Sequence, residues 1–363
     1  MTTARRRLGP ILTHPPRPGR RATAASAAAA AAGLAAAGAG LVARRRSAAT
    51  RPLPPGAVDL LGDLPGERTS VRADDGCPLD VVRTGDGPVT VIFVHGYCVD
   101  RRCWHYQWRS LGQWRDGSAR LVAYDQRSHG RSGRSRADRC TIDQLGQDLR
   151  AVMDTMAPSG PVVVIGHSMG GMTIMALADA FPEIFGDRIV GVALVSTSAG
   201  KLSEATYGLP AGLSAIGYRL APWVLPRLTR RAHLVDAGRK ANAAVGVWLT
   251  KRYSFASEVP PERMALMATL IESTPFAVMA EFFPAFANHN KLKALGVLKK
   301  VPTLVLVGDH DLQTPPDHSR SMAAELATAD LVVVPRAGHM VMLEHPDTVN
   351  AALAGLLERA CPR

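Results

Sequence analysis

A run of β-branched residues that stops at a Gly-x-Ser-x-Gly pattern constrains this chain more than any other feature. Residues 162–171 read Val-Val-Val-Ile-Gly-His-Ser-Met-Gly-Gly. The run predicts a buried strand, and a sharp turn from it into a helix would hold the Ser168 oxygen clear of the backbone. Gly166 and Gly170 have no side chains, so strand and helix can approach closely there. We therefore predict that Ser168 is a nucleophile.

A serine hydroxyl attacks only when a nearby base takes its proton, and a loop further along the chain supplies a candidate. Residues 331–334 read Leu-Val-Val-Val, which predicts a strand, and His339 lies on the loop that follows. A histidine near its unperturbed pKa of about 6.5 can accept the proton of Ser168 and return it to a leaving group. His339 is the predicted base.

The acid that orients such a histidine is expected after another strand. Residues 301–308 are typical of a buried parallel strand, and Asp309 and Asp311 follow where a strand end presents side chains to a site. The two carboxylates are two residues apart, so they would point to the same face if the strand continued. We choose Asp311 as the acid, with Asp309 as its rival.

These patterns, in this order, resemble the signatures of the α/β-hydrolase superfamily. The matching segments are His95-Gly96, Gly166-His-Ser-Met-Gly170, Gly308-Asp-His-Asp311 and Gly338-His339. Residues 124–132 are similar to the family's Asp-x-Arg-Gly-x-Gly-x-Ser loop, although Ser128 stands in place of its first glycine. The resemblance covers residues 67–360. It implies an α/β fold with a mostly parallel, eight-stranded type of sheet flanked by helices, and it favours Asp311 over Asp309.

The resemblance also implies roles for residues around Ser168. The backbone N–H groups of Tyr97 and Met169 would form an oxyanion hole, which holds the negative charge that develops in the transition state. Tyr97 and Met172 flank the oxyanion loop and the turn, so both are candidates for the substrate pocket. His95 is expected to brace its loop rather than to transfer protons.

The alternation of strand and helix patterns divides the chain into parts. Residues 67–198 and 299–363 are expected to form the core, with the site at the carboxyl ends of the strands. Residues 52–66 are punctuated by proline and glycine, which predicts a linker. Residues 199–298 have helical periodicity and are far longer than an ordinary connection. They predict a helical cap inserted over the site.

The predicted cap is rich in aromatic residues, from which an apolar acyl pocket could be built. They are Tyr207, Tyr218, Trp223, Trp248, Tyr253, Phe255, Phe276, Phe282, Phe283 and Phe286. The alternative is that most of them hold the cap together.

The net charge of +12 is concentrated at one end of the chain. Residues 1–51 hold 10 arginines and no acidic residue, so the remainder has 33 basic and 31 acidic side chains. With a body so close to neutral, nucleic-acid binding by a basic face loses its main support. We predict no nucleic-acid partner, and the oligomeric state is left open.

Within residues 1–51, the stretch 22–43 holds no charged residue and 14 alanines. As a helix it would span about 33 Å, enough for a hydrocarbon core of about 30 Å, but alanine gains little on leaving water. A membrane helix or membrane association is the favoured interpretation. An export signal and an undocked alanine-rich tail are the alternatives, which would make the protein exported or cytoplasmic.

The five cysteines include no Cys-x-x-Cys pair, and no His or Cys pair has the spacing of metal ligands in one element. We expect free thiols and predict neither a metal nor an organic cofactor.

Together the residues predict a serine hydrolase of the carboxylesterase or lipase type, which cleaves a carboxylic ester with an apolar acyl group through an acyl-serine. Two other reactions stay open: peracid formation, as in cofactor-free perhydrolases related to haloperoxidases, and C–C bond hydrolysis. A small-molecule binding module on the same scaffold is the non-enzymatic alternative.

Overall fold

The centre of the protein is an eight-stranded sheet. The computed structural model describes residues 60–202, 208 and 211–362, and its strands lie in the order β1-β2-β4-β3-β5-β6-β7-β8. The strands are β1 (Glu67–Arg72), β2 (Pro78–Thr84), β3 (Val89–Val94), β4 (Ala119–Tyr124), β5 (Val162–His167), β6 (Ile189–Val195), β7 (Thr303–Gly308) and β8 (Asp330–Val334). The β1–β2 and β2–β4 pairs are antiparallel, and every other pair is parallel. The predicted mostly parallel sheet is confirmed.

The central strands are buried on both faces, which explains why their sequences are unbroken apolar runs rather than alternating ones. Every residue of β3, β5 and β7 is buried. Successive side chains still point to opposite faces: Ile92 and Val94 of β3 enter one hydrophobic cluster, and Val91 and Phe93 enter the other. The sheet therefore separates two cores.

Helices cover both faces of the sheet. The first core receives side chains from α4 (Ile142–Met156), α5 (Met169–Ala180), α11 (Leu295–Leu298) and α12 (Pro316–Leu326). The second core receives them from α3 (His105–Leu111), α13 (Val341–Glu344) and α14 (Pro346–Ala360). Short 3₁₀ helices connect several elements: η1 (Arg101–Trp104), η2 (Trp114–Gly117), η3 (Ala137–Arg139), η4 (Pro182–Ile184) and η6 (Leu292–Ala294).

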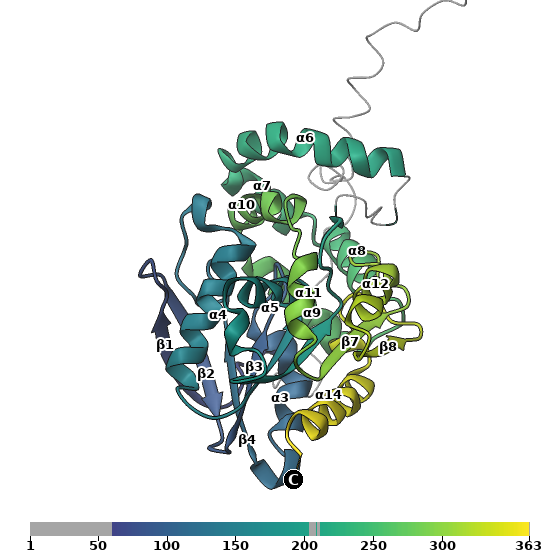
Figure 1. Cartoon of the computed structure of the whole chain (residues 1–363). Helices are drawn as coiled ribbons and strands as arrows, with labels where there is room; N and C mark the ends of the chain where they lie inside the picture. The colour runs from purple at the N-terminus through teal and green to yellow at the C-terminus, as the bar shows by residue number, and fades with distance from the viewer. Residues whose placement is uncertain (1–59, 203–207, 209–210, 363) are drawn as a thin grey trace, which may run out of the picture.

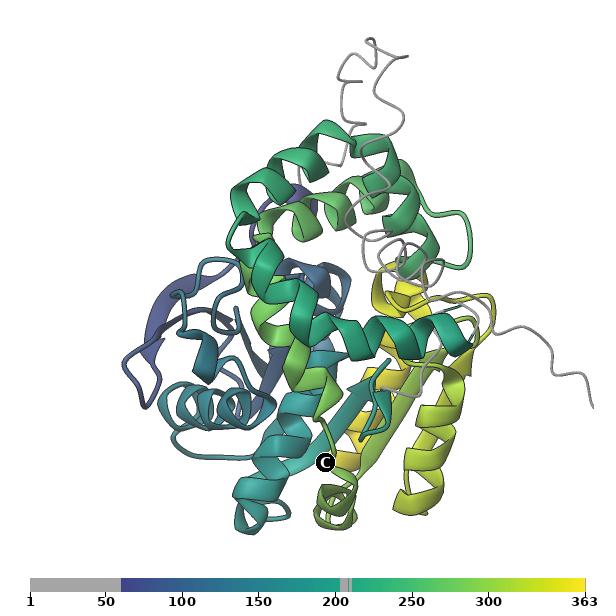
Figure 2. The same cartoon turned by 90° about the horizontal axis from the view of Figure 1, so that it is seen from above.

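The segment between β6 and β7 is helical, and we refer to its helices α6 to α10 as the helical insertion. They are α6 (Ala211–Thr229), α7 (Ala232–Ala241), α8 (Ala243–Ser254), α9 (Pro261–Ser273) and α10 (Phe276–Ala287). Figure 1 shows α6, α7 and α10 as a layer above the sheet with α6 outermost, and Figure 2 shows this layer from above. Buried side chains of α10 belong to the first core, and buried side chains of α9 belong to the second core. The insertion thus rests on the body through α9 and α10.

The predicted linker is partly packed. Leu60 and Leu64 are 6% and 3% exposed and lie in the second core, and Asp63 forms a 2.7 Å ion pair with the buried Arg101. Residues 60–66 are therefore part of the body rather than a free connection. The remainder of the linker and the whole of residues 1–51, including 22–43, lie outside the described residues.

Across the described ranges, no single helix combines the length and the apolar character needed to cross a bilayer. Only α9 and α10 meet that test, as a pair, and they are bent by 88° at their junction.

Candidate active site

Ser168 occupies a strained turn between β5 and α5. Its φ of 51° and ψ of −116° lie outside the ordinary regions for a residue with a side chain. A Cβ on Gly166 would lie 2.5 Å from the carbonyl carbon of Gly170, and a Cβ on Gly170 would lie 2.2 Å from the oxygen of Val94. The Ser168 N–H donates to the Val195 carbonyl of β6 at 2.9 Å. Both glycines are thus required by close backbone packing around this serine.

His339 and Asp311 form a buried pair. The two side chains come from the loops after β8 and β7, and Asp311 Oδ2 lies 2.8 Å from His339 Nδ1. The residues are only 4% and 2% exposed. Because the carboxylate accepts the Nδ1 proton, the free lone pair of a neutral His339 is on Nε2, the nitrogen that can act as a base.

Thr314 completes the surroundings of the carboxylate. Its N–H donates to Asp311 Oδ1 at 2.9 Å, and its hydroxyl donates to Oδ2 at 2.8 Å. Burial by itself would raise the pKa of Asp311, but the charge and hydrogen bond of His339 and the two Thr314 bonds together hold that pKa below its ordinary value. Asp311 is therefore kept ionised in a site that excludes water.

Asp309, the rival acid, faces elsewhere. Its Oδ1 lies 2.6 Å from Nδ1 of the exposed His310 and accepts the Ala337 N–H at 3.2 Å. This places Asp309 against the backbone of the loop that carries His339, while Asp311 contacts the imidazole itself.

His167 joins the turn at Ser168 to the loop at His339. Its Nε2 lies 3.0 Å from the carbonyl oxygen of His339, and the two rings are 4.8 Å apart. Burial lowers the pKa of His167 to about 3, so the ring is neutral and Nε2–H is the donor. Between described residues, no hydrogen bond joins Ser168 Oγ to His339; such bonds are commonly long until a substrate draws the groups together.

Two backbone N–H groups, of Tyr97 after β3 and of Met169 at the start of α5, have no described backbone acceptor. In the first turn of α5, Gly171 N and Met172 N donate to the Ser168 carbonyl at 2.9 and 3.3 Å, which leaves the Met169 N–H without a backbone acceptor among the described residues. The Tyr97 N–H likewise donates to no described backbone group. A Cβ on Gly96, next to Tyr97, would be 3.2 Å from the Ser168 Cβ, so the loop lies against the serine.

His95 braces the same loop. Its Nδ1 lies 2.7 Å from the Gly96 carbonyl oxygen, and its Nε2 lies 2.8 Å from the Gln126 N–H. A carbonyl can only accept and an N–H can only donate, so Nδ1 carries the proton and Nε2 accepts. Burial lowers the pKa of His95 to about 3. Both ring nitrogens are occupied in holding backbone, as the sequence led us to expect.

Glu344 is a buried carboxylate that the sequence analysis did not select. One oxygen accepts the Ala256 and Ser257 N–H groups at 2.9 and 2.5 Å, and the other accepts the Gly338 N–H at 2.6 Å. It thereby ties the loop of His339 to the segment between α8 and α9. No motif marks Glu344; the only available signal was an acidic residue within an otherwise apolar stretch after His339.

An aromatic cluster adjoins the loop of Tyr97. The Tyr97 ring lies 4.9 Å from Phe286 of α10, and His129 lies 6.2 Å from Tyr97 and 5.3 Å from Phe282. The Tyr97 hydroxyl donates to the Met279 carbonyl of α10 at 2.5 Å. Met172 is 2% exposed within the first core, against which Tyr97 also packs. Here the helical insertion meets the strand ends with apolar surface.

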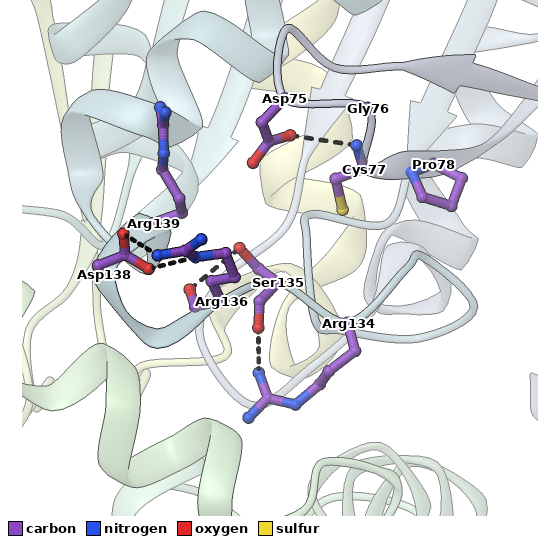
Figure 3. Close-up of a pocket in the computed structure, with 9 residues that line it drawn as sticks. All are labelled: Asp75, Gly76, Cys77, Pro78, Arg134, Ser135, Arg136, Asp138 and Arg139. Atoms are coloured by element: carbon purple, nitrogen blue, oxygen red, sulfur yellow. Dashed lines mark hydrogen bonds and ion pairs between the residues drawn. The ribbon is translucent and has the colours of Figure 1, made fainter.

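A separate cavity lies to one side of these residues. It has a volume of about 510 Å³ and is lined by the β1–β2 turn, Asp75 to Pro78, and by a segment after β4 that includes Arg134 and Arg136. Figure 3 shows Arg136 paired with Asp138, and Asp75 turned toward the Cys77 N–H. Neither Ser168 nor His339 lines it.

Metal ligation has no support in the part of the chain that the structure covers, where no three His, Cys, Asp or Glu side chains are grouped to hold an ion.

Comparison with known proteins decides the family. The model of a group described as "Alpha/beta hydrolase family" matches residues 91–352. The chain belongs to this family. The sheet order and the flanking helices above are thus those of an α/β-hydrolase fold.

Among curated relatives, the chain is 26% identical over 276 residues to the dihydrolipoyllysine-residue acetyltransferase component of an acetoin cleaving system from Pseudomonas putida, covering 76% of this chain and 65% of that protein. It is 24% identical to a pimeloyl-[acyl-carrier protein] methyl ester esterase from Nitrosospira multiformis, covering 74% and 94%.

Solved structures give the same family. A thermophilic esterase from Thermogutta terrifontis is 25% identical with a TM-score of 0.62, over 81% of this chain and 99% of that one. A bromoperoxidase from Bacillus anthracis is 18% identical with a TM-score of 0.61, over 80% and 100%, which establishes the shared fold only. The family and its esterase relatives support an enzyme with hydrolase chemistry.

Proposed function

We propose that this protein is a serine esterase that hydrolyses a carboxylic ester with an apolar acyl group. The observation that carries the proposal is the buried pair of Asp311 and His339, 2.8 Å apart, next to a serine held in a strained turn. Relatives named as esterases support the same reaction class.

The proposed reaction has two halves. Ser168 Oγ attacks the carbonyl carbon while His339 Nε2 takes its proton, and the Tyr97 and Met169 N–H groups stabilise the oxyanion. The bond from carbon to the alcohol oxygen then breaks, and the alcohol leaves with the proton from His339. Water attacks the acyl-serine by the same route in reverse, which releases the carboxylic acid and restores the hydroxyl.

The proposed preference for apolar acyl groups rests on the contacts around Tyr97. Phe286 and Phe282 of α10 face Tyr97 and His129, at centroid distances of 4.9 and 5.3 Å. If the carbonyl oxygen of the substrate points to the Tyr97 N–H, its acyl chain moves out of water and lies beside these aromatic rings. A charged acyl group would lose its hydration there without gaining a partner.

The test is hydrolysis of p-nitrophenyl esters from acetyl to palmitoyl by the wild type and by Ser168→Ala. We expect an initial burst and turnover in the wild type, and a loss of about 10⁴-fold or more in kcat in the variant. The matched control is Ser196→Ala, because Ser196 directly follows the neighbouring strand β6, is fully buried and also has a positive φ of 45°. Equal turnover by Ser168→Ala and Ser196→Ala would refute the mechanism.

Peracid formation is the second candidate, because the sequence Ser168-Met169-Gly170-Gly171 and the aromatic Tyr97 after His95-Gly96 are also those of perhydrolase relatives. In this reaction hydrogen peroxide, rather than water, attacks the acyl-serine and releases a peracid. Adding peroxide to the same assay separates the two, since a perhydrolase would form peracid at the expense of the free carboxylic acid.

A further inference from the structure

The positive charge of the body that no acidic residue balances lies in one part of the helical insertion. Residues 211–252 contain eight arginines and lysines but a single acidic residue, Asp236. The other residues beyond position 51 hold 25 basic and 30 acidic side chains. The near-neutral body is therefore polarised, with its positive charge on α6, α7 and α8.

On α6 these charges form a stripe together with apolar side chains. Ile216, Arg219, Trp223, Arg227 and Arg230 are all exposed. The spacing of three or four residues places Ile216, Arg219, Trp223 and Arg227 on one face of α6 over about 17 Å at 1.5 Å per residue, and Arg230 follows directly after the helix ends at Thr229. The opposite face includes the buried Ala221. We call these five residues the outer stripe.

The outer stripe lies at the far side of the molecule from the sheet. Figure 1 shows α6 as the outermost helix, above α7 and α10. Trp223 is 68% exposed and Ile216 is 40% exposed. Large apolar side chains of this kind cost free energy when they face water, so their exposure indicates a contact surface.

The arginines of the outer stripe have no acidic partner in the described part of the chain, although Arg227 donates to the Trp223 carbonyl at 2.5 Å. Among the described residues, Arg219, Arg227 and Arg230 take part in no ion pair, whereas arginines of the body commonly do, as Arg150 does with Asp154 at 2.8 Å. The single acidic residue of this region, Asp236, is paired with Arg239 at 3.0 Å. An external anion would meet no competing carboxylate along the stripe.

α8 has a similar composition. Val247 and Trp248 are 45% and 61% exposed, and Lys251, one turn further along, is exposed as well. Two helices of the insertion thus each expose a tryptophan with a basic residue at helical spacing, although Lys251 of α8 is paired with Glu258.

We propose that the outer stripe of α6 binds the surface of a bilayer that contains anionic phospholipids. Tryptophan favours the boundary between head groups and acyl chains, while arginines at the same level reach lipid phosphates. A convex helix with interleaved apolar and basic residues matches a flat, deformable anionic surface. The proposal concerns binding and is independent of the proposed esterase reaction.

The first test is flotation of the full-length protein with vesicles of phosphatidylcholine alone and with 30% phosphatidylglycerol. We expect binding only to the anionic vesicles, weakened by salt. Arg219→Gln, Arg227→Gln and Arg230→Gln combined should weaken it at least tenfold, since each basic residue near such a surface contributes on the order of 1 kcal/mol. The control combines Arg109→Gln, Arg320→Gln and Arg359→Gln, which lowers the net charge equally on α3, α12 and α14. Equal loss in both variants would overturn the proposal.

The second test locates the contact. Trp104, Trp108 and Trp114 are at most 8% exposed, so Trp248→Phe leaves Trp223 as the one exposed tryptophan. In that variant, vesicles with brominated acyl chains should quench the fluorescence and shift it to shorter wavelength, and Trp223→Phe should remove the signal assigned to α6. Bound protein whose Trp223 is not quenched would overturn the proposal and place the contact elsewhere, for example in the arginine-rich residues 1–51.

Other occupants of the stripe give distinct results. No vesicle binding, together with a dimer in sedimentation that Trp223→Ala dissociates, would overturn the lipid proposal in favour of a second copy of the chain. Ser168→Ala should bind vesicles like the wild type, so a failure of the esterase reaction would leave this test unaffected.

Discussion

The strand-end site and the outer face of α6 follow opposite rules. At the strand ends, the charged side chains are buried and paired: His339 and Asp311 are 4% and 2% exposed and 2.8 Å apart. On α6, Trp223 is 68% exposed and its neighbouring arginines have no carboxylate partner among the described residues. The charged groups of one region are paired within the chain, and those of the other are exposed and balanced by no described carboxylate.

The two proposed functions place different demands on the structure. Chemistry needs groups whose positions are fixed before the substrate arrives, so they lie on loops anchored by parallel strands and bonded to backbone. Contact with a lipid surface needs exposed anchors and charge but little geometric precision. α9 and α10 connect the regions, because their apolar side chains enter both cores while Tyr97 bonds to Met279.

The largest effect is expected where the comparison is sharpest, at the acid. Asp311→Asn should lower kcat by about 10⁴-fold, because the amide no longer fixes the tautomer and charge of His339. Vesicle binding should be unchanged. Asp309→Asn is the matched control two residues away and should keep kcat within about threefold, given that the residue bonds to His310 and Ala337. Steady-state hydrolysis of one ester decides between them, and equal losses would reject Asp311 as the acid.

Acid should destabilise the body through its buried histidines. Burial lowers the pKa of His95 and His167 to about 3 and that of His129 and His289 to about 4. In the unfolded chain each would titrate near 6.5, so unfolding takes up protons as the pH falls below that value, and stability is lost between about pH 6.5 and the folded pKa.

At about 1 kcal/mol per pH unit for each histidine, these four histidines together should lower the free energy of unfolding by roughly 6–8 kcal/mol from pH 7 to pH 5. Asp125 acts in the opposite sense, because burial, partly opposed by Arg101, raises its pKa to about 7 and it gains a proton in the folded state. Urea titrations at pH 7, 6 and 5 measure the net slope. A stability that rises toward pH 5 would contradict the dominance of the histidines.

Glu344→Gln should weaken the connection between the loop of His339 and the segment between α8 and α9. Both oxygens of Glu344 accept hydrogen bonds, from Gly338 on one side and from Ala256 and Ser257 on the other. Whichever way the amide is turned, its NH₂ group meets a donor, so we expect a loss of about 1–3 kcal/mol in the free energy of unfolding. A several-fold lower kcat should accompany it, since Gly338 positions His339.

The matched control is Glu325→Gln, whose carboxylate is exposed and pairs with Lys299 at 2.8 Å. It should change the free energy of unfolding by less than about 0.5 kcal/mol. If thermal and urea unfolding do not distinguish the two variants, Glu344 does not brace the loop.

The smallest effect is expected for Tyr97→Phe. This change removes the hydroxyl bond to Met279, worth about 1 kcal/mol, but keeps the backbone N–H proposed for the oxyanion. We expect KM for long-chain esters to rise a few-fold with kcat little altered. Tyr106→Phe, which loses a 3.0 Å bond from Arg263 and leaves Tyr97 intact, is the control. A large fall in kcat would show that the hydroxyl also positions the oxyanion loop.

Local patterns were sufficient to predict most of the body. Runs of β-branched residues predict the buried strands, because side chains covered on both faces have no reason to alternate in polarity. The glycines around Ser168 predicted the sharp turn, because the close approach of two backbones excludes any Cβ. The positions of Ser168, Asp311 and His339 at strand ends followed from these strands and from the resemblance to a family.

Contacts between segments far apart in the chain could not be predicted from the sequence. Asp309 and Asp311 differ only in which part of the His339 loop they meet, and Thr314 and Glu344 gain their roles from partners far away in the sequence. Residues 60–66 resembled a linker because the surface that Leu60 and Leu64 cover is made by other segments.

Trp223 and Trp248 illustrate the difference between what the sequence predicts and what the folded structure determines. The aromatic content of residues 199–298 indicated a pocket or the interior of a cap, but the structure places both tryptophans on the exposed faces of α6 and α8. The sequence by itself determined the sheet, the turn at Ser168 and the order of the candidate residues, because these depend on neighbours in the chain. Only the tertiary structure showed that Asp311, the acid chosen from the sequence, contacts the His339 imidazole while Asp309 does not, and which aromatic residues face outward, because burial is a property of the folded surface as a whole.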